Sequence, residues 1–413
     1  MTTTNIPTVY RGVLEEPRLL AAGPDAHWAE HLACFGPLPQ DSSDQQILSE
    51  WEASGLAGRG GGAFPTARKI AAVQRAAART RRAPVVIGNG SEGEPLSFKD
   101  QLLLDHAPHL VLDGLLLTAR ILGARESYIA AKPGLHPRLL DALAERGETS
   151  VALHATDSHF LAGQATAVIS SMEGGPSLPR HPSGHLSDAG LAGAPTLLVN
   201  VETLAHLALI ARYSSAWFRT AGTAADPGSR LLTVHDQGRY QVHEVHGSSD
   251  LSLVLEQLQI SAASIQAVLV GGYHGQWTKD LGVALSAAND DRHHPAALAA
   301  GAGVIEVVRH DICPLARSSQ IIDYLARSSA RQCGPCLHGL PTLARDFQAL
   351  AQRSTDPELP EQVHRLGALV AGRGSCHHPD ASARLAISAL QVFDDEVSAH
   401  LSGTCHHNSQ EHQ

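Results

Sequence analysis

The chain has 413 residues, 41 of them acidic and 31 basic, which gives a formal net charge of -10 with neutral histidines. This charge offers no general electrostatic attraction to nucleic acid or anionic lipid. At about 100 to 200 residues per domain, the length predicts two to four domains. The sequence shows neither an uncharged apolar run long enough to span a membrane nor a secretion signal, so we expect a cytoplasmic protein.

The first half alternates apolar strand-like runs with helical stretches, which is typical of an α/β domain with a largely parallel sheet. We place this domain at residues 55–225, after an N-terminal arm over residues 1–54. Helices are expected over residues 66–82 and 100–122, and strands in PVVIGNG and SYIAAK. A loop rich in Pro, Gly, His and Ser follows at residues 174–196.

The period of the pattern changes in the second half. Residues 226–300 contain two alternating strands that meet at a turn at Gln237 and Gly238, then an amphipathic helix and a further strand. This order predicts a small β-grasp (ubiquitin-like) domain. Residues 301–400 show apolar side chains at mostly helical spacing, which predicts a C-terminal helical bundle, and the polar residues 401–413 are expected to form a flexible tail.

A glycine-rich segment, GLAGRGGGAFPTARK, precedes the first predicted helix. Gly58, Gly60 and Gly61 leave the backbone open next to the free N–H groups of a helix N-terminus, which is a favourable place for a phosphate. Lys69, one of four lysines in the chain, would add a positive charge for the same anion. The alternative is a tight turn between two elements.

The segment NGSEGEPLSFKD follows the predicted strand PVVIG, at the edge where parallel sheets bind ligands. Asn89 and Ser91 can hydrogen-bond the edge of a ring, and Glu92 and Glu94 can accept from hydroxyl or amide groups. The alternative is a charged surface loop.

Four cysteines lie in the C-terminal region. Cys333 and Cys336 form a C-x-x-C motif, Cys376 follows 40 positions after Cys336, and Cys313 precedes Cys333 by 20. Such thiols are able to hold an iron-sulfur cluster or zinc, to act as a redox dithiol, or to be plain buried thiols.

Other chemistry finds little support in the sequence. Scattered histidines, including the pairs at 377–378 and 406–407, are expected to be solvated, with metal binding by these pairs as the alternative. The motifs HExxH, GxSxG and GxxxxGK[ST] are absent, so zinc protease, serine hydrolase and nucleotide triphosphatase chemistry lack their usual residues.

Five segments, GRGGGAFPTARK, NGSEGEPLSFKD, FLAGQATAVISSMEG, VNVETL and CGPC followed by CHHPDA, occur in an order that resembles the flavin- and NADH-binding subunit of respiratory complex I. Related subunits occur in NAD-reducing hydrogenases and formate dehydrogenases. The resemblance covers about residues 50–395. It implies FMN, a 4Fe-4S cluster, an SLBB-like β-grasp insert and a terminal helical bundle. It also implies hydride transfer from NADH to the flavin and single-electron transfer onward, with no catalytic side chain assigned.

The resemblance also implies a set of cofactor contacts. Carried onto this sequence, they are Gly58, Arg59, Gly60, Gly61, Phe64, Lys69, Asn89, Ser91, Glu92, Gly163, Gln164 and Asn200. Phe64 matches an aromatic that faces the adenine. Ser91 replaces an Asp of the family, and Val199 replaces an Asn.

Three further departures affect the nicotinamide side. Gln164 and Ala165 replace two acidic residues, and Ala72 replaces a second stacking aromatic, at a cost on the order of 0.5 to 1.5 kcal/mol. Losing the carboxylates removes repulsion toward a 2′-phosphate, whereas the retained Glu92 favours NADH. The expected donor is therefore NADH or NADPH.

The cluster motif departs from the family's C-x-x-C-x-x-C because Ala330 occupies the first position. The matched cysteines are Cys333, Cys336 and Cys376. Since a 4Fe-4S cluster takes four ligands, we hypothesise that Cys313 supplies the fourth thiolate. The alternatives are a three-cysteine cluster completed by His338, His377 or water, and loss of the cluster.

We therefore expect an FMN- and iron-sulfur-containing oxidoreductase component that passes electrons from NADH or NADPH to a ferredoxin-like or 2Fe-2S protein, within a larger redox complex. The sequence carries no N-terminal 2Fe-2S cysteine set, so the next carrier is expected on another chain. One alternative is an electron-transfer module that has lost nicotinamide binding. Another is a scaffold that has lost its cofactors.

Overall fold

The computed structural model describes residues 8–9, 14, 16–180, 184–287 and 297–407. The first of its two large sheets has four parallel strands in the order β4-β3-β2-β5. These strands are β2 (Val85–Gly90), β3 (Glu126–Ala131), β4 (Val151–Ala155) and β5 (Thr196–Asn200). The central strand β2 is almost continuously buried, as expected of a parallel strand covered on both faces. Because the strands are parallel, their carboxyl ends share one edge of the sheet.

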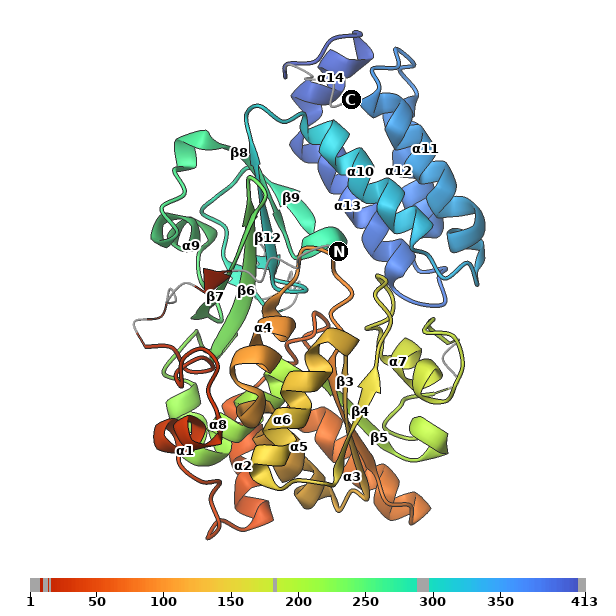
Figure 1. Ribbon diagram of the computed structural model, residues 1–413. Helices are drawn as coiled ribbons and strands as arrows, with labels where there is room; N and C mark the ends of the chain where they lie inside the picture. The colour runs from red at the N-terminus through yellow and green to blue at the C-terminus, as the bar shows by residue number, and fades with distance from the viewer. Residues whose placement is uncertain (1–7, 10–13, 15, 181–183, 288–296, 408–413) are drawn as a thin grey trace.

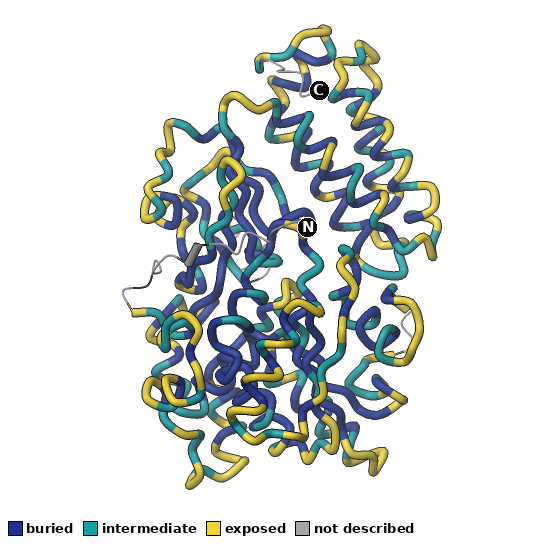
Figure 2. Tube along the Cα trace, viewed as in Figure 1, coloured by how far each residue is buried: buried dark blue, intermediate teal, exposed yellow. Residues whose placement is uncertain are grey.

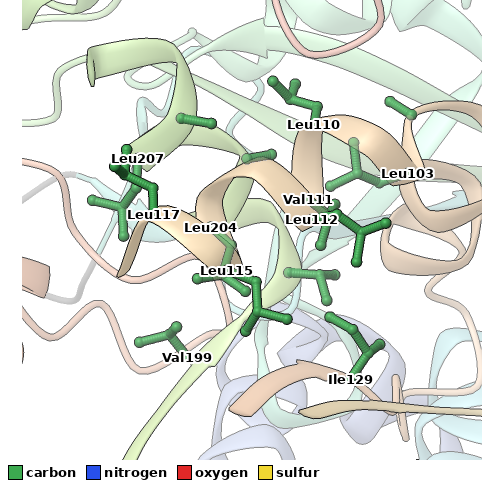
Figure 3. Close-up of a cluster of buried hydrophobic side chains, with 14 of the residues drawn as sticks. Leu103, Leu110, Val111, Leu112, Leu115, Leu117, Ile129, Val199, Leu204 and Leu207 are labelled. Carbon is green, nitrogen blue, oxygen red and sulfur yellow. The ribbon is translucent and has the colours of Figure 1, made fainter. Parts of the chain in front are cut away.

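Helices cover this sheet (Figure 1). They are α3 (Thr66–Thr80), α4 (Lys99–His106), α5 (Pro108–Leu122), α6 (His136–Arg146), α7 (Ala165–Met172) and α8 (Val201–Phe218), with short 3-10 turns η1 (Pro133–Leu135) and η2 (Leu191–Gly193). Leucines of α5 and α8 interleave in the largest core (Figure 3). The two helices approach so closely that a Cβ on Gly114 would lie 1.9 Å from the carbonyl oxygen of Leu204. Only glycine fits at this crossing.

The single helix predicted over residues 100–122 is wrong in one respect, because the structure has two helices, α4 and α5, bent by 92°. Ala107 separates them in a non-helical conformation. Pro108 explains the break, because proline has no N–H to donate and disfavours helical geometry in the residue before it. No single helix in the described part of the chain is long and apolar enough to cross a membrane, although this bent pair meets the same criteria together.

The predicted N-terminal arm contains two helices that pack on the α/β region. They are α1 (Trp28–Phe35) and α2 (Asp44–Ser54). Ser43 and Gln46 form a capping box at the start of α2, and the buried Trp51 donates its indole N–H to the carbonyl oxygen of Leu207 at 3.0 Å. These helices therefore belong to the packed body and do not form a separate arm.

A second, mixed sheet has the strand order β1-β7-β6-β12-β8-β9. Its strands are β1 (Thr8–Val9), β6 (Ser229–Asp236), β7 (Arg239–His246), β8 (Ile265–Val270), β9 (Gln276–Thr278) and β12 (Val304–Arg309). As predicted, β6 and β7 are antiparallel and meet at Gln237 and Gly238, which both have positive φ. Strand β12 pairs in parallel with β6, so this sheet extends beyond the boundary expected at residue 300.

Shorter elements accompany the second sheet. They are α9 (Leu251–Gln257), the 3-10 turns η3 (Ala262–Ser264) and η4 (Gly272–His274), and the short pair β10 (Leu285–Ser286) and β11 (Leu298–Ala299). Apolar side chains of α9, including Leu251 and Val254, share a buried core with β6 and β8.

Helices dominate the C-terminal region, at the upper right of Figure 1. They are α10 (Pro314–Arg327), the π-helical η5 (Pro335–Gly339), α11 (Leu340–Ala351), α12 (Leu359–Val370), α13 (His378–Val392) and α14 (Asp394–Leu401). Leu315, Phe347 and Leu385 meet in one core that also includes Tyr273 of η4 and Trp277 of β9, so the helices and the second sheet are packed together. Figure 2 shows this buried interior in dark blue.

The end of the chain departs from the expected flexible tail. Residues 402–407 turn back against the helices, where His406 Nδ1 lies 2.9 Å from a carboxylate oxygen of Glu396. His407 Nδ1 lies 2.8 Å from the carbonyl oxygen of His310. The rest of the predicted tail, residues 408–413, lies outside the described residues.

Candidate functional site

A cleft of about 890 Å³ opens where the carboxyl edge of the parallel sheet meets the second sheet and the segment after Cys376. Its walls combine the glycine-rich loop, the ends of β2 and β5, the start of α7 and the segment around η4. Ten of the twelve residues predicted as cofactor contacts line it, all except Arg59 and Ser91. The cleft therefore brings together segments that are far apart in the sequence.

The glycine-rich loop is held closed at its base. The N–H of Gly58 donates to the carbonyl oxygen of Phe64 at 3.0 Å, and the N–H of Thr66 donates to that of Leu56 at 3.0 Å. Gly61 adopts a φ of +93°, which side chains disfavour. The loop leads directly into α3, so its backbone and the first turn of that helix face the cleft. This geometry fits a phosphate group.

Lys69 supplies a positive charge beside this loop. Its Nζ donates to the carbonyl oxygen of Leu198 at 2.5 Å, and among the described residues no carboxylate lies within ion-pairing distance of it. Burial lowers the pKa of Lys69. A partly buried ammonium group without a counter-ion is electrostatically costly, and a bound phosphate would remove that cost. Lys69 therefore fits the phosphate of FMN.

The prediction that Arg59 is a cofactor contact is not supported, because Arg59 does not line the cleft. Its guanidinium group lies 3.2 Å from Asp226 Oδ1 and donates to the carbonyl oxygen of Pro227 at 2.9 Å, and the residue is 5% exposed. Its backbone N–H donates to Thr203 Oγ1 at 2.9 Å. Arg59 thus fixes the glycine-rich loop against the start of the second sheet, and its side chain is already paired.

Asn89 and Asn200 lie at the carboxyl ends of the adjacent strands β2 and β5. Asn89 Nδ2 donates to the carbonyl oxygen of Gly163 at 2.9 Å, and its Oδ1 accepts from the hydroxyl of Ser91 at 2.7 Å. Ser91, which does not line the cleft, therefore orients Asn89. Asn200 caps α8 by accepting from the N–H of Glu202 at 3.0 Å. These hydrogen bonds hold both side-chain amides in fixed orientations at the cleft wall, where they are able to contact the edge of a planar ring.

Glu92 and Gln164 both cap helices that begin at the cleft. The carboxylate of Glu92 accepts from the N–H groups of Asp100 and Gln101, each at 3.0 Å. Gln164 Oε1 accepts from the N–H groups of Thr166 and Ala167 at 2.7 and 3.0 Å. The neutral Gln164 thus performs a capping role that an acid also performs, without adding negative charge beside the cleft.

Lys99 is a cleft residue for which the sequence analysis proposed no role. Its Nζ lies 2.6 Å from Asp100 Oδ1 and 2.9 Å from Glu202 Oε2, and all three residues are buried. Although burial opposes it, the two carboxylates raise the pKa of Lys99. Burial raises the pKa of Asp100 to about 7 despite the neighbouring ammonium group. The one feature of the sequence that could have singled out Lys99 as a site residue is the rarity of lysine, which occurs four times in the chain.

Glu94 is a second unusual acid on the cleft wall. It is 8% exposed, and burial raises its pKa to about 8. Its Oε2 accepts from the N–H of Tyr273 at 2.9 Å, which ties the loop after β2 to η4. Phe64, in contrast, is 55% exposed at the cleft, so its ring is available for stacking.

Three of the four predicted cluster ligands gather at one end of the helical region. Burial, together with the neighbouring thiols of Cys333 and Cys376, raises the pKa of Cys336 to about 12. Burial also raises the pKa of Cys376. Although burial opposes it, hydrogen bonds with the backbone of Ser375 and with Cys336 lower the pKa of Cys333. A bound cationic metal cluster would stabilise all three side chains as thiolates. The donor set fits an iron-sulfur cluster, and Cys376 also lines the cleft.

The hypothesis that Cys313 completes this set is not supported by the fold. Cys313 caps the start of α10, whereas Ala330 and Cys333 follow the end of this 14-residue helix, about 21 Å away by helix geometry. The Sγ of Cys313 instead lies 3.5 Å from His400 Nε2. The two histidine alternatives, His338 and His377, are both exposed, and His377 lines the cleft.

The expectation that the histidine pairs are solvated is only half correct. His377 is exposed, but His378 is 2% exposed, and its Nε2 donates to the carbonyl oxygen of Leu325 at 2.9 Å. His407 is also largely covered, with a side chain that is 10% exposed.

Two family models match this chain. The Nuo51 FMN-binding domain matches residues 51–209, and the NADH-ubiquinone oxidoreductase-F iron-sulfur binding region matches residues 316–400. Together they cover more than half of the chain, and Cys313 lies outside both. Fold and site thus define a flavin-binding iron-sulfur protein.

Curated relatives agree with these matches. The second F-type NADH-quinone oxidoreductase subunit of Rhizobium meliloti is 27% identical over 377 residues, covering 86% of this chain and 89% of the relative. The mitochondrial NADH dehydrogenase [ubiquinone] flavoprotein 1 of Dictyostelium discoideum is 26% identical, covering 86% and 79%. The chain belongs to the family of F-type NADH-quinone oxidoreductase subunits.

Solved structures share the fold. A chain of an NAD+-reducing [NiFe]-hydrogenase in the air-oxidized state matches with a TM-score of 0.80 at 23% identity, covering 96% of this chain and 68% of that chain. A chain of an NAD+-reducing [NiFe]-hydrogenase in the H2-reduced state matches with a TM-score of 0.77 at 24% identity, covering 87% of this chain. The present chain spans 63% of the length of that second hydrogenase chain.

Proposed function

We propose that this chain is the flavin- and iron-sulfur-bearing component of an NAD(P)H dehydrogenase, which delivers electrons from a nicotinamide nucleotide to a protein acceptor. The observation that carries the proposal is that Cys376 and the glycine-rich loop line the same cleft. A flavin in this cleft would lie next to the cysteine set. FMN supplies, when bound, the conversion between two-electron hydride transfer and one-electron transfer.

The residues of this chain position the reacting groups. We assign Lys69 and the glycine-rich loop to the phosphate of FMN, and Asn89 and Asn200 to the edge of its ring. Phe64 is assigned to the adenine of the nucleotide. Lys99, paired with Asp100 and Glu202, forms a buried charge network at the cleft wall, next to Asn200 at the end of β5.

We assign Cys333, Cys336 and Cys376 to a 4Fe-4S cluster. His377 is our candidate for the fourth position, because it follows Cys376 directly and is exposed on the cleft. Water is the alternative. A single nitrogen or oxygen ligand among three thiolates would alter the EPR spectrum and potential of the cluster relative to four thiolates.

Either nicotinamide nucleotide fits the charge of the cleft. Gln164 is neutral, both oxygens of Glu92 are engaged with the start of α4, and the exposed Arg180 also lines the cleft. Arg180 Nη1 lies 2.5 Å from Glu173 Oε2, so a 2′-phosphate would share this cation with one carboxylate. These features support acceptance of NADPH as well as NADH.

The wider assembly also forms part of the proposal. The Rhizobium meliloti relative is named as one subunit of an oxidoreductase, which supports a place for this chain in a larger redox complex. We propose a ferredoxin-like or 2Fe-2S protein as the direct acceptor. We further propose that residues 226–309 form a β-grasp insert, because the first and last long strands of this segment, β6 and β12, pair in parallel. The C-terminal residues that follow are proposed to form the helical bundle that binds the cluster.

The test is an anaerobic absorbance spectrum of the purified chain before and after stoichiometric NADH, and separately NADPH. Bleaching of the flavin band by either nucleotide supports the proposal and identifies the donor. If dithionite reduces the flavin and cluster but neither nucleotide does, the chain is an electron-transfer module without nicotinamide binding. A colourless protein that cannot be reconstituted would contradict both interpretations.

A further inference from the structure

A second group of metal-ligand side chains lies at the opposite end of α10 from Cys333. It consists of Cys313 at the start of α10, Glu396 and His400 on α14, and Cys405 in the turn that follows α14. One ligand atom from each of the four lies within 4.8 Å of the others. His400 Nε2 lies 3.5 Å from Cys313 Sγ and 3.0 Å from Glu396 Oε1.

The orientation of His400 is fixed by a second contact. Its Nδ1 donates to the carbonyl oxygen of Leu350 at 2.9 Å, which fixes the orientation of the ring. Nε2 is therefore the ring nitrogen that faces Glu396 and Cys313. Metal-binding histidines are held in this way, with one ring nitrogen on the metal and the other donating to a backbone carbonyl. His400 is 1% exposed, so the ring cannot turn freely toward solvent.

The spacing follows from the local structure. Glu396 and His400 are four residues apart on α14 and therefore share one face of the helix. Cys405 reaches them because the chain turns back after Leu401, where the N–H of Thr404 donates to the carbonyl oxygen of Ala399 at 2.9 Å. This turn brings the last described residues onto the start of α10.

We propose that Cys313, Glu396, His400 and Cys405 form a structural zinc site. Two thiolates, one imidazole and one carboxylate are ligand types that tetrahedral Zn²⁺ accepts, whereas Mg²⁺ and Ca²⁺ prefer oxygen ligands throughout. Zn²⁺ binds with both thiols deprotonated, so binding releases these protons to solvent. The metal would clamp the end of the chain to the beginning of the helical region.

This site is independent of the proposed function. It lies about 21 Å along α10 from the cluster cysteines, and none of its four residues lines the cleft. Zinc neither donates nor accepts electrons in proteins, so its role here is structural. Occupancy can therefore be measured whether or not the chain oxidises a nicotinamide nucleotide.

The experiment measures zinc and iron per chain by elemental analysis in the full-length protein, purified anaerobically, incubated with zinc chloride and freed of excess metal. We expect about one tightly held zinc per chain, and zinc-edge X-ray absorption showing two sulfur neighbours at about 2.3 Å. Cys405→Ser should weaken zinc binding by more than about 100-fold, which exceeds the usual effect of losing a second-shell partner. Iron and FMN content should be unchanged.

Further variants keep the result unambiguous. Cys313→Ser retains an N-cap oxygen for α10, so loss of zinc in this variant would not come from loss of the cap. Cys34→Ser, at an exposed cysteine on α1, is the matched control and should keep its zinc. The proposal is overturned if no zinc is retained, if zinc is lost in Cys333→Ser but kept in Cys405→Ser, or if mass spectrometry finds Cys313 and Cys405 joined as a disulfide in the isolated protein.

Discussion

Nε2 of His274 lies 2.9 Å from Nδ1 of His378. Because His378 Nε2 donates to the carbonyl oxygen of Leu325, its Nδ1 must accept, and His274 is the donor. Burial lowers the pKa of His274 well below its usual value, so this ring is neutral at neutral pH. The ring of Phe160 packs against both imidazoles. This contact joins η4 of the second sheet to the segment that carries Cys376.

We therefore expect His274→Leu to destabilise the protein. The change leaves the buried Nδ1 of His378 without a donor, at a cost of about 1 to 3 kcal/mol. Chemical unfolding followed by circular dichroism measures the loss. His185→Ala, at an exposed histidine that does not line the cleft, should change stability by less than about 0.5 kcal/mol. Equal effects of the two substitutions would show that the His274 to His378 contact does not hold this segment.

Lys69→Met tests the phosphate assignment. Removing one charge-assisted hydrogen bond to FMN should cost about 1.5 to 3 kcal/mol, which raises the FMN dissociation constant roughly 10- to 150-fold. Quenching of FMN fluorescence on adding apoprotein measures that constant. Lys279→Met is the matched control, because Lys279 is exposed and does not line the cleft. Unchanged FMN affinity in Lys69→Met would remove Lys69 from the site.

The sequence predicted the parallel sheet and the cleft wall well, because both depend on local patterns. The glycines before α3 and the polar residues after β2 are adjacent in sequence to the elements they follow or precede, and the carboxyl ends of parallel strands are where such sheets bind ligands. Arg59 was misplaced because its partner, Asp226, lies far along the chain. Cys313 was wrongly grouped with the cluster cysteines because the spacing of cysteines in the sequence cannot show that α10 separates Cys313 from Cys333. His378 was expected in solvent because its partners, His274 and Leu325, come from two other elements.

Glu94 predicts a pH dependence of stability. Its pKa is raised from the ordinary 4.5 to about 8 in the folded protein, because burial disfavours the charged form. Between these values the folded chain binds one more proton than the unfolded chain. The protonated side chain of Glu94 therefore contributes its full amount to the free energy of unfolding below about pH 4.5. This contribution falls as the pH rises, by up to about 1.4 kcal/mol per pH unit, and is lost once the pH passes about 8.

Glu94→Gln cannot ionise, so we expect this variant to lose less stability than the wild type between about pH 5 and pH 8. Unfolding midpoints of both proteins across this range measure the difference, and Glu361→Gln, at an exposed residue of α12, should follow the wild type. Parallel pH profiles for Glu94→Gln and wild type would mean that Glu94 is ionised in the folded protein at neutral pH.

Cys333→Ser and Cys376→Ser should separate the two halves of the proposed reaction. Each removes one of three thiolates from the assigned cluster, so iron content and the EPR signal of the reduced cluster should fall strongly in both. Cys333 does not line the cleft, so Cys333→Ser should keep its FMN and its reduction by NADH or NADPH. Electron delivery to a 2Fe-2S protein should fall by more than about tenfold, since the cluster is the proposed exit route.

Cys34→Ser again serves as the control and should behave as the wild type in all of these assays. Cys376 borders the cleft, and its substitution is expected to affect FMN affinity as well as iron content, which Cys333→Ser should not. If Cys333→Ser retained full iron and full delivery to the 2Fe-2S protein, the cysteine set would not be the electron exit. The electrons would then leave the flavin directly, and the adjacency of Cys376 to the cleft would have only a structural role.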